Sequence, residues 1–136
     1  MRIVFMKEII HEFEIRVRYE ETDKMGIVYS GKYFVYFEVG RTELLRSFGK
    51  SYRQLEETGI GLPVVETYCR HRKPATYDDL LVIRTKAALK KSLLRFDYEI
   101  RLKGEKDILS EGYTIHLFMN DAGKIVTAPD YIKEIF

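Results

Sequence analysis

The chain has 136 residues, about the size of one domain, so we expect a single domain spanning residues 1–136. Hydrophobic residues make up 46% and charged residues 32% of it, a balance typical of a soluble globular protein and not of a disordered one. The formal net charge of +2 is too small to predict a nucleic-acid-binding protein, and no segment is apolar for long enough to cross a membrane.

The N-terminal stretch MRIVFMKEII is not expected to be a signal peptide, because Lys7 and Glu8 interrupt it and a small-residue cleavage site is missing. A cytoplasmic location follows as the expectation. The single cysteine, Cys69, excludes an internal disulfide and is expected to be a small core residue. The three histidines are far apart and show no ligand spacing, so neither a metal nor a cofactor is expected.

The first predicted elements are a strand and a helix separated by an acid-rich turn. Residues Glu12–Glu20 alternate, with Phe13, Ile15, Val17 and Tyr19 on one face, which predicts a strand with one wet face. Apolar residues then recur at helical spacing, which predicts a helix that begins near Gly31 or Lys32 and ends at Gly49. Its apolar surface is wider than one stripe, so we expect protein on several of its sides.

A short second helix and a run of strands follow. Ser51 is predicted to cap a helix over Tyr52–Thr58, and the predicted strands are Val64–Arg72, Leu80–Leu89, Leu94–Leu102 and Ile108–Met119. In the last of these, Tyr113, Ile115, Leu117 and Met119 are expected to face inward. A hairpin at Asn120–Gly123 leads to a short strand at Ile125, and Pro129 precedes a terminal helix, Asp130–Phe136.

The order of these elements predicts the fold class. One strand, one long buried helix and then strands joined by short loops favour an antiparallel sheet and an α+β fold. A single very apolar helix is best buried if the sheet curls around it.

The stretch from Tyr19 to Tyr33, YEETDKMGIVYSGKY, is the most informative for function. Asp23 lies in a turn just before the predicted helix, whose first N–H groups lack intrahelical acceptors and carry the positive end of the dipole. Such amides can polarise a carbonyl while the carboxylate attacks it or activates water. The alternative is that Asp23 is only a cap or a turn residue.

The segments RVRYEETDKMGIVYSGKYFVYFEVGRTELLR, LPVVETYCRHRKPATYDDLLVIRT and KKSLLRFDYEI together resemble the 4-hydroxybenzoyl-CoA thioesterase family, and in particular its YbgC-like acyl-CoA thioesterases. The resemblance covers nearly the whole chain. It implies a hotdog fold, in which a curled antiparallel sheet wraps one long central helix, and active sites at the interface of a homodimer that is often doubled into a homotetramer. It also implies acyl-CoA, or alternatively an acyl-carrier-protein thioester, as the substrate.

The resemblance also assigns roles by position. Asp23 matches the catalytic aspartate, Gly26 the glycine three residues later, and Tyr29, Ser30 and Gly31 the segment whose backbone N–H points at the thioester carbonyl. YbgC-like members usually have histidine where this chain has Ser30. Lys90, Lys91 and Ser92 match residues that contact the CoA phosphates, and their alternative is a solvated hairpin end.

Other interpretations remain open at this stage. Glu38, within the helix, is a competing catalytic acid, although an ion pair with Arg41 is favoured for it. The basic residues Arg70 to Lys73 are a second candidate contact for phosphates. A hotdog dehydratase or hydratase would need a histidine paired with an acid, and the Asp23 stretch contains no histidine. A non-enzymatic acyl-CoA-binding protein would not need Asp23.

Overall fold

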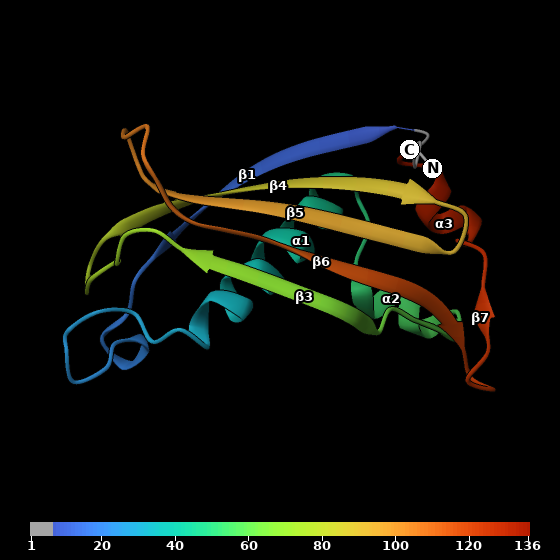
Figure 1. The fold of residues 1–136 in the computed structure, drawn as a ribbon. Helices are drawn as coiled ribbons and strands as arrows, with labels where there is room; N and C mark the ends of the chain where they lie inside the picture. The colour runs from blue at the N-terminus through green and yellow to red at the C-terminus, as the bar shows by residue number, and fades with distance from the viewer. Residues whose placement is uncertain (1–6) are drawn as a thin grey trace, which may run out of the picture.

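A computed structural model of the chain describes residues 7–136. The strands form an antiparallel sheet in which β1, β4, β5 and β6 lie side by side, and β3, β2 and β7 each pair with β6 (Figure 1). The strands are β1 (Glu8–Arg16), β2 (Ile60–Gly61), β3 (Val64–His71), β4 (Leu80–Lys90), β5 (Leu93–Leu102), β6 (Ile108–Asn120) and β7 (Ile125–Val126). The helices are η1 (Tyr19–Glu21, 3₁₀), α1 (Lys32–Ser47), α2 (Tyr52–Glu57) and α3 (Asp130–Lys133).

The sheet curls around α1, which packs against its inner face (Figure 1). Gly40 allows this close approach, because a Cβ atom there would lie 2.5 Å from Oγ1 of Thr85 on β4. Further along the interface, the rings of Phe37 and Tyr98 stack with their centroids 4.2 Å apart. The predicted α+β architecture, a curled antiparallel sheet around one long helix, is confirmed.

The predicted ends of α1 and α2 are confirmed within about two residues, whereas α3 ends at Lys133 and not at the predicted Phe136, because Ile135 and Phe136 donate to carbonyls three residues earlier and form a turn. The helix α1 begins at Lys32, and Gly49 follows it with φ of 75°, a conformation that glycine adopts without strain. The side chain of Ser51 caps α2, where its Oγ accepts from the N–H of Gln54 at 3.1 Å.

The first strand differs from the prediction over Glu12–Glu20. It runs from Glu8 to Arg16, because residues 8–16 pair in register with residues 88–80 of β4. The chain then leaves the sheet, and Tyr19, which was expected to face inward, begins the 3₁₀ turn with a side chain that is 78% exposed. The wet face is confirmed, since Glu12, Glu14 and Arg16 are exposed.

The predicted inward face of β6 is wrong. Its buried residues alternate with those expected and include Thr114, His116 and Phe118. The register with β5 explains this, because Thr114 lies opposite the buried Phe96, and residues directly opposite each other share a face. Polar residues can lie inward here because they form hydrogen bonds to one another.

Within residues 7–136, no helix is long and apolar enough to span a membrane. The expectation that MRIVFMKEII is not a signal peptide concerns mostly residues 1–6, which lie outside the described residues.

Candidate active site

Asp23 lies in a tight loop whose two sides pair with each other. Thr22 and Val28 form an isolated antiparallel bridge, and the N–H of Asp23 donates to the carbonyl of Ile27 at 2.9 Å. Gly26 closes the turn with φ of 79°, a left-handed conformation that glycine adopts without strain. The carboxylate accepts from the N–H of Met25 at 2.8 Å through Oδ1, and among the described residues no hydrogen bond engages Oδ2. One carboxylate oxygen is therefore available on an exposed side chain.

The N-terminus of α1 presents free amides beside this loop. The N–H of Tyr29 is occupied, since it donates to the carbonyl of Glu21 at 2.9 Å. By contrast, the N–H groups of Ser30 and Gly31 have no acceptor among the hydrogen bonds of residues 7–136. Gly31, the N-cap, also leaves room for the Tyr29 ring, because a Cβ atom there would lie 2.7 Å from Tyr29 Cε1. Two unpaired donors at the positive end of a helix are suited to bind a developing negative charge.

Asp23 and Ser30 line one pocket of about 470 Å³. Two chain segments build it: the loop and helix start, and the segment that follows β3. They are joined by a bridge between Ile27 and Thr76 and by the N–H of Val28, which donates to the carbonyl of Ala75 at 2.8 Å. The lining is partly apolar and comprises Asp23, Ile27, Val28, Tyr29, Ser30, Tyr33, His71, Arg72, Lys73 and Pro74.

His71 is the pocket residue that the sequence did not indicate as functional. It lies at the end of β3, and its ring meets that of Tyr33 edge-on at 4.6 Å between centroids. Its Nδ1 lies 3.2 Å from Oγ of the buried Ser110, a hydroxyl and not a carboxylate. Burial raises the pKa of Tyr33, so this phenol stays protonated at neutral pH. Tyr33 and His71 thus give the pocket an aromatic surface that also carries hydrogen-bonding groups.

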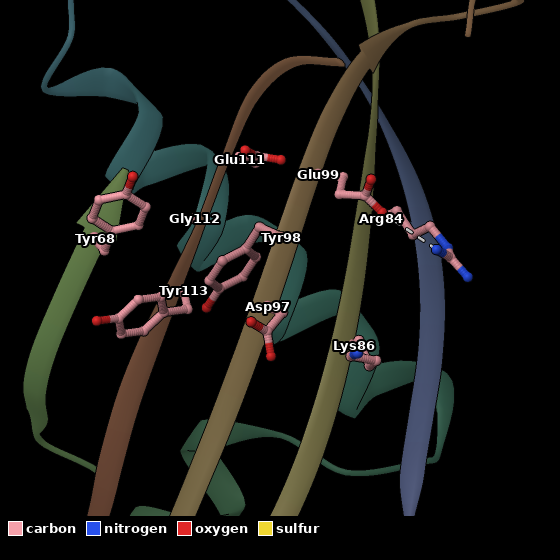
Figure 2. A pocket seen from close by; sticks show the side chains of 9 residues that line it. All are labelled: Tyr68, Arg84, Lys86, Asp97, Tyr98, Glu99, Glu111, Gly112 and Tyr113. Atoms are coloured by element: carbon pink, nitrogen blue, oxygen red, sulfur yellow. Dashed lines mark hydrogen bonds and ion pairs between the residues drawn. The ribbon is translucent and has the colours of Figure 1, made fainter. Parts of the chain in front are cut away.

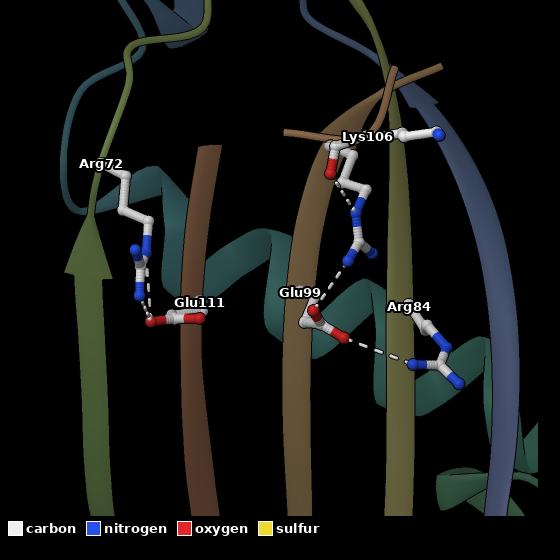
Figure 3. Close-up of polar contacts among 6 residues, drawn as sticks. Arg72, Arg84, Glu99, Lys106 and Glu111 are labelled. Atoms are coloured by element: carbon white, nitrogen blue, oxygen red, sulfur yellow. Dashed lines mark hydrogen bonds and ion pairs between the residues drawn. The ribbon is translucent and has the colours of Figure 1, made fainter. Parts of the chain in front are cut away.

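Two members of the basic run Arg70 to Lys73 stand at the rim of the same pocket. Arg72 pairs with Glu111 of β6 at 2.6 Å, as Figure 3 shows, and Lys73 pairs with Asp107 at 2.5 Å. These acids raise the pKa of Arg72 and of Lys73, so both side chains are cationic. Each of these two cations is therefore already paired with an acid.

Lys90, Lys91 and Ser92 lie far from Asp23 in the same chain. They form the turn between β4 and β5, at the end of the sheet beside α3, whereas the Asp23 loop extends from the opposite end (Figure 1). The eleven residues of β4 separate the two ends by about 33 Å, at roughly 3.3 Å per residue. The carbonyl of Lys91 accepts from Ala128 at 3.0 Å, which fixes the turn. Their role toward CoA stays a prediction.

The expected ion pair between Glu38 and Arg41 is wrong. Arg41 donates instead to the hydroxyls of Tyr52 at 3.2 Å and Tyr98 at 3.4 Å, while Glu38 is exposed. Arg41 reaches Tyr98 of β5, whereas Glu38 forms no ion pair among residues 7–136. Glu38 does not line the Asp23 pocket.

A second hollow of about 300 Å³ lies on the outer face of the sheet, where Tyr68, Asp97 and Tyr113 project from neighbouring strands (Figure 2). Its acids are already paired with cations: Glu99 pairs with Arg84 at 3.3 Å, and Asp97 pairs with the neighbouring Arg95 at 3.0 Å. Cys69 is also unsuited to catalysis, since burial raises the pKa of its thiol to about 11. The Asp23 pocket is therefore the candidate active site.

Comparison with known proteins places the fold in one family. Residues 25–109 match the family model described as the thioesterase superfamily. YbgC of Haemophilus influenzae, named an acyl-CoA thioesterase, is 33% identical over 127 residues, which are 91% of this chain and 92% of that protein. YneP of Bacillus subtilis is 46% identical over 72 residues, 53% of this chain and 52% of that protein, so this match spans about half of each.

A solved structure supports the same assignment. The DHNA-CoA thioesterase of Staphylococcus aureus superposes with a TM-score of 0.85 and 29% identity, over 93% of this chain and 85% of that one. The fold is the hotdog fold of these thioesterases. The chain belongs to the thioesterase superfamily, and its full-length similarity to YbgC of Haemophilus influenzae places it near the YbgC-like members.

Proposed function

We propose that the protein is an acyl-CoA thioesterase, which hydrolyses a thioester to a free acid and CoA at the Asp23 pocket. One observation carries this proposal. An exposed carboxylate with a free oxygen and Ser30, whose amide is unpaired, line the same pocket, which is large enough for an acyl group; the unpaired amide of Gly31 follows directly in the chain. Family membership and the names of relatives such as YbgC support the choice of a thioester as the substrate.

The chemistry needs little more than these groups. The amides of Ser30 and Gly31 would bind the carbonyl oxygen and stabilise the negative charge that develops there. Asp23 would either attack the carbonyl carbon, giving an anhydride that water then cleaves, or take a proton from an attacking water. In both routes the C–S bond breaks and CoA leaves as a thiolate, which is a good leaving group without protonation.

The substitution Asp23→Asn tests the proposal. It should lower kcat for free-thiol release from acyl-CoA at least a hundredfold, because the amide neither attacks nor accepts the proton. Thermal stability should change little, since the side chain is exposed and makes one local hydrogen bond. A panel of aliphatic and aromatic acyl-CoAs should be used, so that a poor substrate is not mistaken for inactivity. Normal turnover by Asp23→Asn with every active substrate would disprove the mechanism.

A hydratase or dehydratase is the second candidate, because His71 and Asp23 line one pocket. Such an enzyme would need His71 held by an acid, whereas the ring is bonded to Ser110. The two activities are separated by incubation with an enoyl-CoA, in which hydration removes the conjugated absorbance without releasing thiol. Hydrolysis releases thiol, and we expect this outcome.

We also propose that the active unit is a homodimer or a homotetramer. The strand β3 has its second edge unpaired within residues 7–136, and Val64, Val65 and Tyr68 on it are 42–54% exposed. Phe34 and Val35, on the adjoining side of α1, are 42% and 41% exposed. A second chain that covers this surface would bury it and close the Asp23 pocket against water. In a homotetramer, the outer face of the sheet would supply the further interface.

The partner chain would also explain how Lys90, Lys91 and Ser92 bind CoA although they lie far from Asp23 of their own chain. In a two-fold pair joined along antiparallel β3 strands, the β4–β5 turn of one chain lies toward the end that holds Asp23 of the other. Lys90, Lys91 and Ser92 would then bind the phosphates of a CoA molecule whose acyl group occupies the partner's pocket. Arg72 and Lys73, on the rim, would attract the same anion within the chain.

A further inference from the structure

Glu21 is a buried acid within the sequence that leads to the catalytic loop. Its side chain is only 2% exposed, and no other carboxylate among residues 7–136 is buried. Its Oε1 accepts from the hydroxyl of Tyr36 at 3.0 Å and from the N–H of Arg18 at 2.8 Å. Burying a carboxylate costs free energy unless its oxygens accept hydrogen bonds. The Tyr36 hydroxyl and the Arg18 N–H are therefore strongly favoured to stay in place as donors to Glu21.

The same residue also holds the loop through its backbone. The carbonyl of Glu21 accepts from the N–H of Tyr29, just before the free amides, and Asp23 follows two residues after Glu21. Tyr36 lies one turn into α1 and is fully buried. Burial, followed by the neighbouring Glu21 carboxylate, raises the pKa of Tyr36, so the phenol keeps its proton and is the donor.

We propose that Glu21 and Tyr36 are positioning residues, which hold the Asp23 loop at a fixed distance from the amides at the start of α1. This inference rests on the proposed function. The carboxylate and the amides belong to different elements, and the Glu21–Tyr36 hydrogen bond joins the residues just before the Asp23 loop to α1. Hydrolysis needs both groups at one carbonyl, and a displacement of about 1 Å can cost about a hundredfold in rate.

The test compares Tyr36→Phe with Tyr98→Phe. Each removes one buried phenolic hydroxyl from the same core, but the hydroxyl of Tyr98 bonds to Thr114 and Arg41, away from the loop. Tyr36→Phe should lower kcat at least tenfold with KM within threefold of the unaltered protein. Tyr98→Phe should keep kcat within twofold. Rates are measured well below both melting temperatures, and Glu21→Gln serves as a second variant if Tyr36→Phe fails to fold.

The decisive measurement repeats Tyr36→Phe in the Asp23→Asn background. A positioning residue acts through Asp23, so the second substitution should reduce the residual rate less than twofold, whereas general damage would multiply the two losses. Equal kcat values for Tyr36→Phe and Tyr98→Phe, or multiplied losses, would overturn the inference while leaving the thioesterase proposal intact. Full activity of Asp23→Asn alone would overturn both.

Discussion

Stability at mildly acidic pH should depend on one buried histidine, His116. Its side chain is inaccessible to solvent, and its Nδ1 lies 3.1 Å from the carbonyl oxygen of Leu62, to which it donates. Its Nε2 therefore accepts from Oγ1 of Thr114 at 2.9 Å, and Thr114 accepts in turn from Tyr98 at 2.6 Å. When the imidazole is neutral, each donor in this hydrogen-bond network has an acceptor.

Protonation of His116 would add a charge with no acceptor for the new N–H. Burial lowers the pKa of His116, the hydrogen bond to the Leu62 carbonyl opposes part of this shift, and the Arg41 guanidinium at the far end of the hydrogen-bond network adds to it, which together give a pKa of about 4. In the unfolded chain the pKa returns to 6.5. As the pH falls below 6.5 the unfolded state binds the proton first, so stability is lost on acidification, down to about pH 4.

The size of this loss follows from the two pKa values. A difference of about 2.5 units corresponds to about 3.4 kcal/mol once both states are protonated. Between pH 7 and pH 5 the loss from this residue alone is about 2 kcal/mol, a substantial part of the stability of a domain of this size.

Urea unfolding at pH 7 and pH 5 measures the effect, at one protein concentration because subunit association contributes to stability. Carboxylates also titrate in this range, so the comparison is with His116→Gln, which has a neutral donor and acceptor. The variant is expected to be less stable at pH 7, yet the unaltered protein should lose about 2 kcal/mol more than the variant on going to pH 5. Equal losses in the two proteins would refute the argument.

Three further predictions concern the proposed substrate contacts and the proposed assembly. Ser30→Ala should keep kcat within about tenfold because the backbone donor remains, whereas Ser30→Pro removes the N–H and should cost hundreds-fold, about 3 kcal/mol, provided that circular dichroism shows a normal fold. Loss of activity in Ser30→Ala equal to that in Asp23→Asn would instead indicate a serine-dependent mechanism. Lys90→Ala combined with Lys91→Ala should raise KM for acyl-CoA with little change in kcat, and an unchanged KM would leave these residues as a solvated turn. If the partner chain supplies them, subunit exchange between this variant and Asp23→Asn should restore activity at low acyl-CoA above the sum of the two, since each mixed dimer has one intact site. Sedimentation should show a dimer or larger at assay concentration.

The sequence predicted those elements in which one face is clearly apolar. Residues 94–102 alternate strictly between apolar and charged, and α1 has a Gly at its end, so the bounds of β5 and α1 agree with the structure within one or two residues. The strand β6 has apolar side chains on both faces. Hydropathy alone favoured Tyr113, Ile115 and Leu117, while the register with β5 places Thr114 and His116 inward.

The site was predicted only where its residues are adjacent in sequence. Asp23, Gly26 and Ser30 belong to one short stretch, and local rules for turns and helix starts apply to it. His71 reaches the same pocket through the pairing of Ile27 with Thr76, a contact between distant parts of the chain that no local pattern records. The hydrogen bond from Tyr36 to Glu21 also depends on the tertiary fold, so the helical pattern could not indicate it.

The proposed assembly separates chemistry from substrate choice. Asp23, the free amides and the Glu21–Tyr36 bond all belong to one chain and are fixed by contacts within it. His71, the last residue of β3, lines the pocket, so in the proposed dimer a second chain paired along β3 would supply the remaining wall and the CoA-binding turn. Substitutions along β3 could therefore change which acyl groups are accepted without altering the catalytic groups, because the wall against the acyl chain and the machinery at the carbonyl would come from different chains.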